Sequence, residues 1–209
     1  MKANELKVKF IEWLISKQKK EDYVIGNEVL FSVDKCRADI LLLKDNKMIA
    51  YEIKSDSDNF LDIDYQLNQY LSTFNYTYLV VTLKHIKQLE YLKEYNIGLI
   101  LYDKDKFKIL KKPLLSQQIM KENLVEFIQK QSLKNLIKFS KCDNLSVFKY
   151  RKLVVEKCSK NKIQEQAYNT LKNRYSRLFK LFLLDTSRDN IMIEDLKTLT
   201  GNITTDKLY

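Results

Sequence analysis

Two acidic residues and a lysine stand at the ends of two neighbouring apolar segments in the first third of the chain. Asp39 lies near the start of residues 37–43, and Glu52 and Lys54 end residues 47–54, with the polar pair Asp45 and Asn46 between the segments. A hairpin turning at that pair would bring the two acids and the amine together. Two carboxylates beside an amine can hold a divalent cation next to a phosphate. The spacing therefore predicts a metal-dependent nuclease.

The pleat of a strand decides which of these groups share a face. Because successive side chains point to opposite faces, Glu52 and Lys54 lie together while Ile53 points away. The backbone carbonyl of Ile53 stays available as a further oxygen ligand. Mg²⁺ favours such sites, in which one or two carboxylates are completed by water and a substrate phosphate.

The elements that must position these residues follow an α/β order and then become helical. Apolar spacing predicts helices over residues 4–20, 60–71 and 84–95. Segments rich in β-branched and aromatic residues predict strands over residues 28–33, 37–43, 47–54, 76–82, 97–102 and 107–110. After Pro113 the spacing predicts helices over residues 119–139, 147–158, 162–184 and 193–199.

The order of acids, lysine and elements resembles the PD-(D/E)XK nuclease superfamily, which includes restriction enzymes, junction resolvases and recombination exonucleases. In that superfamily an acid ends one strand and (D/E)-x-K lies on the next, as Asp39 and Glu52-Ile53-Lys54 do here. Glu28 matches an upstream acid, and Gln66 with Tyr70 matches a Gln-x-x-x-Tyr on the following helix. The resemblance covers residues 4–110 and is greatest to small bacterial and phage members, although Ala38 replaces the usual proline.

The resemblance implies a fold and a role for each residue. It implies an α/β fold with a restriction-endonuclease-like core, a central mixed sheet flanked by helices, in residues 1–112, and an all-α region in residues 113–209. Asp39, Glu52 and Glu28 would bind Mg²⁺ or Mn²⁺, while Lys54 would orient water or offset charge on the phosphate. Gln66 would steady Lys54 or a water, and Tyr70 would contact the DNA backbone.

Each of these residues also has a plain structural interpretation. Glu28 could be an exposed strand residue, Asp39 could cap a turn, and Glu52 with Lys54 could form a surface ion pair. Gln66 and Tyr70 could be helix surface and core. His85 is the only histidine, so a His-Cys zinc site or a Ser-His-Asp triad is disfavoured, and His85 is expected to pack or cap.

Positive charge is concentrated in the second half of the chain. The net charge is +10, of which residues 1–112 contribute +2 (19 basic, 17 acidic) and residues 113–209 contribute +8 (18 basic, 10 acidic). A basic helical region suits DNA, although lysine-rich surfaces also serve solubility, and the bundle could instead form a homodimer or bind a protein. The residues expected to contact DNA are Arg37, Lys149, Arg151, Lys152, Lys172, Arg174 and Arg177.

Composition narrows the function classes that remain. Apolar runs are too short to span a bilayer, and the first residues do not form a signal peptide, so no membrane partner is expected. Three widely spaced cysteines without a C-x-x-C pair fit a reducing cytoplasm. The main alternative to a nuclease is a non-catalytic nucleic-acid- or protein-binding module on the same fold. A transcription regulator is a weaker alternative, because it leaves the acid cluster unexplained.

Overall fold

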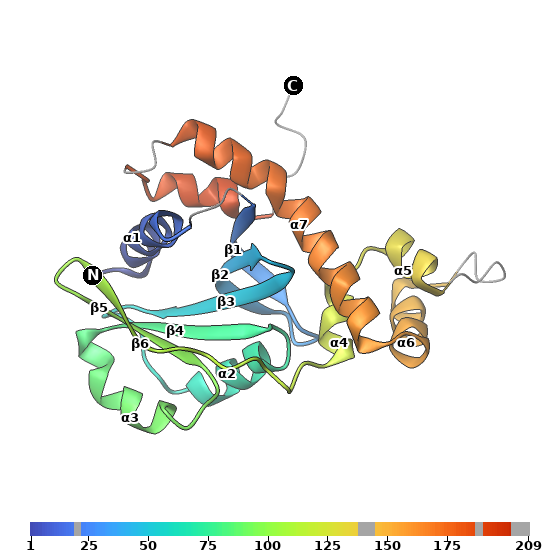
Figure 1. Cartoon of the computed structure of the whole chain (residues 1–209), viewed down its shortest axis with the longest axis horizontal. Coiled ribbons are helices and arrows are strands. Elements are labelled where there is room, and N and C mark those ends of the chain that lie inside the picture. The colour runs from blue at the N-terminus through green and yellow to red at the C-terminus, as the bar shows by residue number, and fades with distance from the viewer. Residues whose placement is uncertain (19–21, 138–144, 187–189, 202–209) are drawn as a thin grey trace.

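The computed structural model describes residues 1–18, 22–137, 145–186 and 190–201. At its centre is a six-stranded sheet in the order β1-β2-β3-β4-β5-β6 (Figure 1). Strands β3, β4 and β5 are parallel, and the other neighbours are antiparallel. The strands are β1 (Tyr23–Phe31), β2 (Cys36–Lys44), β3 (Lys47–Lys54), β4 (Tyr76–Thr82), β5 (Gly98–Asp103) and β6 (Lys106–Lys111). The expected α/β class, with a mixed sheet and a helical C-terminal region, is confirmed.

Helices cover both faces of the sheet. Figure 1 shows α1 and α7 on one side and α2 and α3 on the other. One large cluster of buried apolar residues includes members from both faces, and a second, smaller cluster joins α2 and α3 to β4 and β5. The α-helices are α1 (Ala3–Ser16), α2 (Ile63–Leu71), α3 (Leu89–Leu92), α4 (Lys121–Leu124), α5 (Lys130–Ile137), α6 (Val147–Lys157) and α7 (Lys160–Asp185). Three 3₁₀ segments are η1 (Leu83–Gln88), η2 (Val125–Phe127) and η3 (Glu194–Leu199).

The β2–β3 hairpin is set by its two-residue turn. Lys44 pairs with Lys47, and Asp45 and Asn46 between them have φ of 49° and 56°. Positive φ at both central residues is the type I′ geometry, which Asn and Asp tolerate and which matches the twist of the flanking strands. The turn therefore determines the register of everything that follows along β2 and β3.

Some predicted helices are wrong in length or type. The helix predicted over residues 119–139 is broken into α4, η2 and α5. Leu124, Val125, Phe127 and Ile128 are all at most 2% exposed, and Ile128 has an extended backbone. A straight helix would also place these four side chains within one half of its circumference, so their burial does not by itself require the break, and the extended backbone of Ile128 is what ends the helical turns.

The other differences lie at helix ends and in short helices. Residues 84–95 and 193–199 form mainly 3₁₀ turns, and the first helix ends at Ser16. The last residues of two predicted helices, 19–20 and 138–139, lie outside the described residues. The predicted positions of the helical segments along the chain therefore agree with the structure better than their predicted lengths do.

The C-terminal region packs directly on the sheet. The Asn27 side chain of β1 donates a hydrogen bond to the Leu196 carbonyl at 3.1 Å, and the rings of Tyr23 and Phe179 lie 5.2 Å apart. One cluster of buried residues contains members of α1, β1, β2, β3 and α7. The regions on either side of residue 113 thus share a hydrophobic core, although the sheet itself ends at β6. Over the described ranges, no helix combines the length and the apolarity that crossing a bilayer requires.

Candidate functional site

The strand registers align three acids across β1, β2 and β3. Pairing of Asn27 with Ile40 puts Glu28 opposite Asp39, and pairing of Ile40 with Tyr51 puts Asp39 opposite Glu52. The Asp39 side chain bridges the end of the second ladder, because its Oδ2 accepts a hydrogen bond from the Ile53 backbone N–H at 2.8 Å. The structure therefore brings together Asp39, Glu52 and the upstream Glu28.

Glu52 and Lys54 point to one face of β3 and meet α2. Glu52 Oε1 lies 3.0 Å from Lys54 Nζ, and Lys54 Nζ donates to Gln66 Oε1 at 2.7 Å. Both members of the pair are buried, with 6% and 8% of their surface exposed. The interpretation of Glu52 and Lys54 as a surface ion pair is therefore wrong. Gln66 holds Lys54, which was one of the two roles expected for it.

Tyr70 has a different role from the one expected. It is 1% exposed, its hydroxyl donates to Glu52 Oε2 at 2.6 Å, and its ring packs 4.9 Å from that of Phe31. The hydroxyl also accepts a hydrogen bond from the Asp39 backbone N–H at 3.3 Å. A side chain buried in this way cannot contact a DNA backbone, so that expectation is wrong. Tyr70 instead orients Glu52 and the start of β2.

The loop that follows β3 fixes the position of the backbone at the end of that strand. Asp58 Oδ2 accepts hydrogen bonds from the Ser55 backbone N–H at 2.7 Å and from its hydroxyl at 2.6 Å. His85 Nε2 lies 2.8 Å from the Ser55 carbonyl, and His85 is buried against Phe60. His85 is thus a packing residue, as expected, Asp58 is a loop residue, and together they fix the backbone next to Lys54.

Lys7 was missed by the sequence analysis. Its Nζ lies 2.7 Å from Asp39 Oδ1 and also forms an ion pair with Glu28, and the residue is only 5% exposed. Lys7 stands three and four residues before the buried Phe10 and Ile11, which is the spacing of one helix face. A lysine within an apolar stripe was the signal that could have identified it.

Burial makes negative charge costly in this cluster. Desolvation, with the charge of Asp39 next in importance, raises the pKa of Glu52 to about 7, against the opposing effects of Lys54 and Tyr70. Desolvation also raises the pKa of Asp39, although the Lys7 ammonium opposes that shift. Burial alone would lower the pKa of Lys7, but the charges of Asp39 and Glu28 raise it above its usual value.

Asp39 and Glu52 are the residues that could hold a cation. Among the described residues, His, Cys, Asp and Glu side chains form no group of three or more arranged around a common metal position. Glu28, expected as a third ligand, instead pairs with Lys7 and lies 3.7 Å from Arg37. Mg²⁺ binds through one or two carboxylates with water and phosphate oxygens, so the neighbouring carboxylates of Asp39 and Glu52, whose charges repel each other, fit such an ion.

The basic residues expected to contact DNA divide into two groups. Arg151 forms an ion pair with Glu126 at 2.8 Å, and Lys172 forms one with Asp22 at 2.8 Å, so internal acids already occupy both. These two cations therefore have intramolecular partners, and their contact with DNA stays a prediction. The remaining cations of the predicted set are exposed: Arg37, Lys149, Lys152, Arg174 and Arg177.

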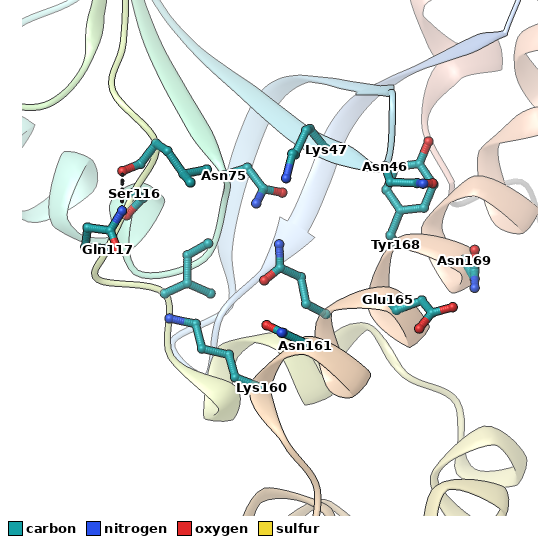
Figure 2. A pocket seen from close by; sticks show the side chains of 13 residues that line it. Asn46, Lys47, Asn75, Ser116, Gln117, Lys160, Asn161, Glu165, Tyr168 and Asn169 are labelled. Carbon is teal, nitrogen blue, oxygen red and sulfur yellow. Dashed lines mark hydrogen bonds between the residues drawn. The ribbon is translucent and has the colours of Figure 1, made fainter.

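A separate pocket lies at the other end of β2 and β3. It has a volume of about 570 Å³, and Figure 2 shows Asn46 and Lys47 of the hairpin turn facing Asn161, Glu165 and Tyr168 of α7 across it. Asp39 stands seven residues from Asn46 along β2, roughly 23 Å away. Among the described residues that line this pocket, Glu165 is the only carboxylate. The pocket therefore lacks the paired acids that the predicted chemistry requires.

Comparison with known proteins gives a family. The chain matches the family described as Bacteriophage P4 protein cII over residues 1–200. It is 30% identical to Protein cII of Enterobacteria phage P4 over 213 aligned residues, which cover 96% of this chain and 78% of that protein.

Two solved structures show limited similarity. SPO1766, a protein of unknown function from Silicibacter pomeroyi, is 16% identical with a TM-score of 0.45, covering 90% of this chain and 96% of that one. An XisH family protein from Nostoc punctiforme PCC 73102 is 19% identical with a TM-score of 0.33, covering 51% and 97%.

The family match overturns the assignment to the PD-(D/E)XK superfamily. That assignment depended on a few side chains within residues 4–110, whereas the match extends through the sheet and the helical region alike. The chain belongs to the bacteriophage P4 protein cII family.

Proposed function

We propose that the chain is a divalent-cation-dependent nuclease that hydrolyses DNA phosphodiester bonds in the cytosol. One observation carries the proposal: Asp39 and Glu52, two carboxylates opposite each other on adjacent strands, lie beside a lysine that Gln66 holds in place. A restriction-endonuclease-like core is part of the proposal. It is supported by this arrangement of side chains and not by family membership.

Each residue has a role that follows from its contacts. Asp39 and Glu52 would hold Mg²⁺ or Mn²⁺, and such an ion would polarise the scissile phosphate and acidify a water. Lys54, buried and held by Gln66, would offset negative charge that develops on the phosphate, as expected of a pre-positioned cation in a site of low dielectric. Tyr70 would keep the Glu52 carboxylate in a single orientation.

The exposed cations of α6 and α7 support DNA as the substrate. Lys149 and Lys152 are exposed on α6, and Arg174 and Arg177 are exposed on α7. Exposed cations on one helical region attract phosphates, and each contact releases counterions from DNA. These residues would hold the DNA backbone while the acid cluster cleaves it.

Cleavage assays with matched variants test the proposal. The purified chain would be incubated with supercoiled, linear, single-stranded and branched DNA in Mg²⁺, Mn²⁺ or EDTA. Asp39→Asn, Glu52→Gln and Lys54→Ala should each abolish a cation-dependent activity. Glu165→Gln, which changes a carboxylate at the distant pocket, should retain it. Cleavage that survives in all three site variants would refute the assignment.

A non-catalytic binding module is the second candidate. The observation that favours it is Lys7, whose ammonium forms ion pairs with both Asp39 and Glu28 and so offsets their negative charge. A module of this kind would bind DNA with the same salt dependence in EDTA and in Mn²⁺, and it would not cleave any of the four substrates.

A further inference from the structure

Lys7 is the one buried lysine of α1, and both of its ion-pair partners, Asp39 and Glu28, are acids of the candidate site. The other lysine of that helix, Lys9, is exposed and pairs with Asp105 at 2.8 Å. Burying an ammonium is costly unless carboxylates surround it. Lys7 meets that condition through Asp39 on β2 and Glu28 on β1.

The two oxygens of Asp39 have different partners. Oδ2 accepts the Ile53 backbone N–H at 2.8 Å, and Oδ1 lies 2.7 Å from Lys7 Nζ. A divalent cation that binds Asp39 needs an oxygen at about 2.0–2.1 Å for Mg²⁺. Oδ1 is the oxygen not engaged by the backbone, so the ammonium occupies the position that the cation would take.

We propose that Lys7 is a built-in counter-ion that competes with the divalent cation for Asp39 Oδ1 and moves onto Glu28 when the cation binds. The proposal rests on the proposed function, because it assumes the cation site at Asp39 and Glu52. Lys7 Nζ already contacts Glu28, so the displacement requires a side-chain shift without movement of α1. Glu28 is then the acceptor of the displaced ammonium instead of a third metal ligand.

Competition has a consequence that a merely structural lysine would not have. Removing the charge of Lys7 should weaken the metal-free fold, since Asp39 and Glu28 lose their partner. The same change should strengthen cation binding. At a protein-like dielectric, two unit charges about 4 Å apart repel each other by more than the free energy that corresponds to a tenfold change in affinity. Removing the charge of Lys7 should therefore raise the affinity for the divalent cation about tenfold or more.

The experiment compares Mn²⁺ binding by the wild-type chain and Lys7→Met, using titration calorimetry and thermal melts in EDTA and in Mn²⁺. Methionine is unbranched like lysine, keeps most of its length and has a similar helix propensity, and it carries no charge. The expected result is a lower melting temperature in EDTA and an Mn²⁺ dissociation constant about tenfold lower or more. Lys9→Met, two residues along the same helix, is the matched control and should bind Mn²⁺ like the wild type.

Each outcome separates this inference from the proposed function. Equal Mn²⁺ affinity in wild type and Lys7→Met, with binding in both, would overturn the competition and leave the cation site standing. Absence of Mn²⁺ binding in every variant would refute the cation site and the inference with it. If Lys7→Met does not fold in EDTA, Lys7→Gln is the second variant. If Mn²⁺ restores folding of either variant, the result would support competition. If neither variant folds at saturating Mn²⁺, the result would overturn it.

Discussion

Replacing Tyr70 by Phe should destabilise the metal-free protein through the loss of a single hydroxyl. The substitution keeps the aromatic ring and its packing against Phe31, and it removes the donor that lies 2.6 Å from Glu52 Oε2. A hydrogen bond to a charged group contributes about 1.5–3 kcal/mol, whereas one between neutral groups contributes about 0.5–1.5 kcal/mol. The loss should therefore depend on whether Glu52 is ionised.

The pH dependence of this loss has a definite sign. The pKa of Glu52 is about 7 in the folded protein, above its usual value, and the Tyr70 hydroxyl opposes that rise by binding the charged form. Removing the hydroxyl raises the folded-state pKa further, which lowers stability only where the wild-type Glu52 is ionised. The destabilisation should grow as pH rises through about 7 and shrink as pH falls below it, with a difference of roughly 1 kcal/mol.

Urea unfolding in EDTA, followed by the fluorescence of Trp13, would measure the loss at about pH 5.5 and about pH 8.5, on either side of the Glu52 titration. Tyr51→Phe is the matched control. Tyr51 is 4% exposed, and within the described part of the chain its hydroxyl has no hydrogen-bond partner. It should change stability by less than about 0.5 kcal/mol at either pH. A Tyr70→Phe loss no larger than that of the control, or equal at both pH values, would refute the reasoning.

Three further predictions concern the core, the sheet and the basic surface. Phe10→Ala should cost about 3–5 kcal/mol of unfolding free energy because Phe10 is fully buried, whereas Leu61→Ala, at an 87% exposed position, should change it by less than about 0.5 kcal/mol in the same urea experiment. Gly98→Ala should lower the melting temperature, because a Cβ there would lie 2.3 Å from Cδ1 of Tyr78; an unchanged melting temperature would show that the ring moves aside freely. Replacing four of the exposed cations of α6 and α7 by alanine should reduce the salt dependence of DNA affinity in EDTA, by up to about 0.9 in log–log slope for each phosphate that is no longer neutralised. The four are Lys149, Lys152, Arg174 and Arg177, and an unchanged slope would place the DNA elsewhere.

The central pair of acids could be predicted from sequence because a local feature determines it. Asp45 and Asn46 adopt the two positive φ values of a type I′ turn, and that turn sets the register of β2 and β3. Once the register is set, Asp39 must lie opposite Glu52. The alternation along β3 then places Lys54 on the same face as Glu52. Family membership could not be deduced from the same residues, since a few side chains on a common kind of sheet do not distinguish one family from another.

Other features depended on partners that are distant in sequence, and only the tertiary structure decided them. Lys7 meets Asp39 across 32 residues, and Lys172 meets Asp22 across 150 residues. Tyr70, expected either to contact the DNA backbone or to belong to the helix core, is buried by the strands that cover it and positions Glu52. The periodicity of a helix tells which side chains share a face, but it does not tell which element covers that face. The sequence by itself therefore determined the paired acids and their lysine. The fold decided which cations neutralise them and which remain exposed, because burial and ion pairing are properties of the assembled core.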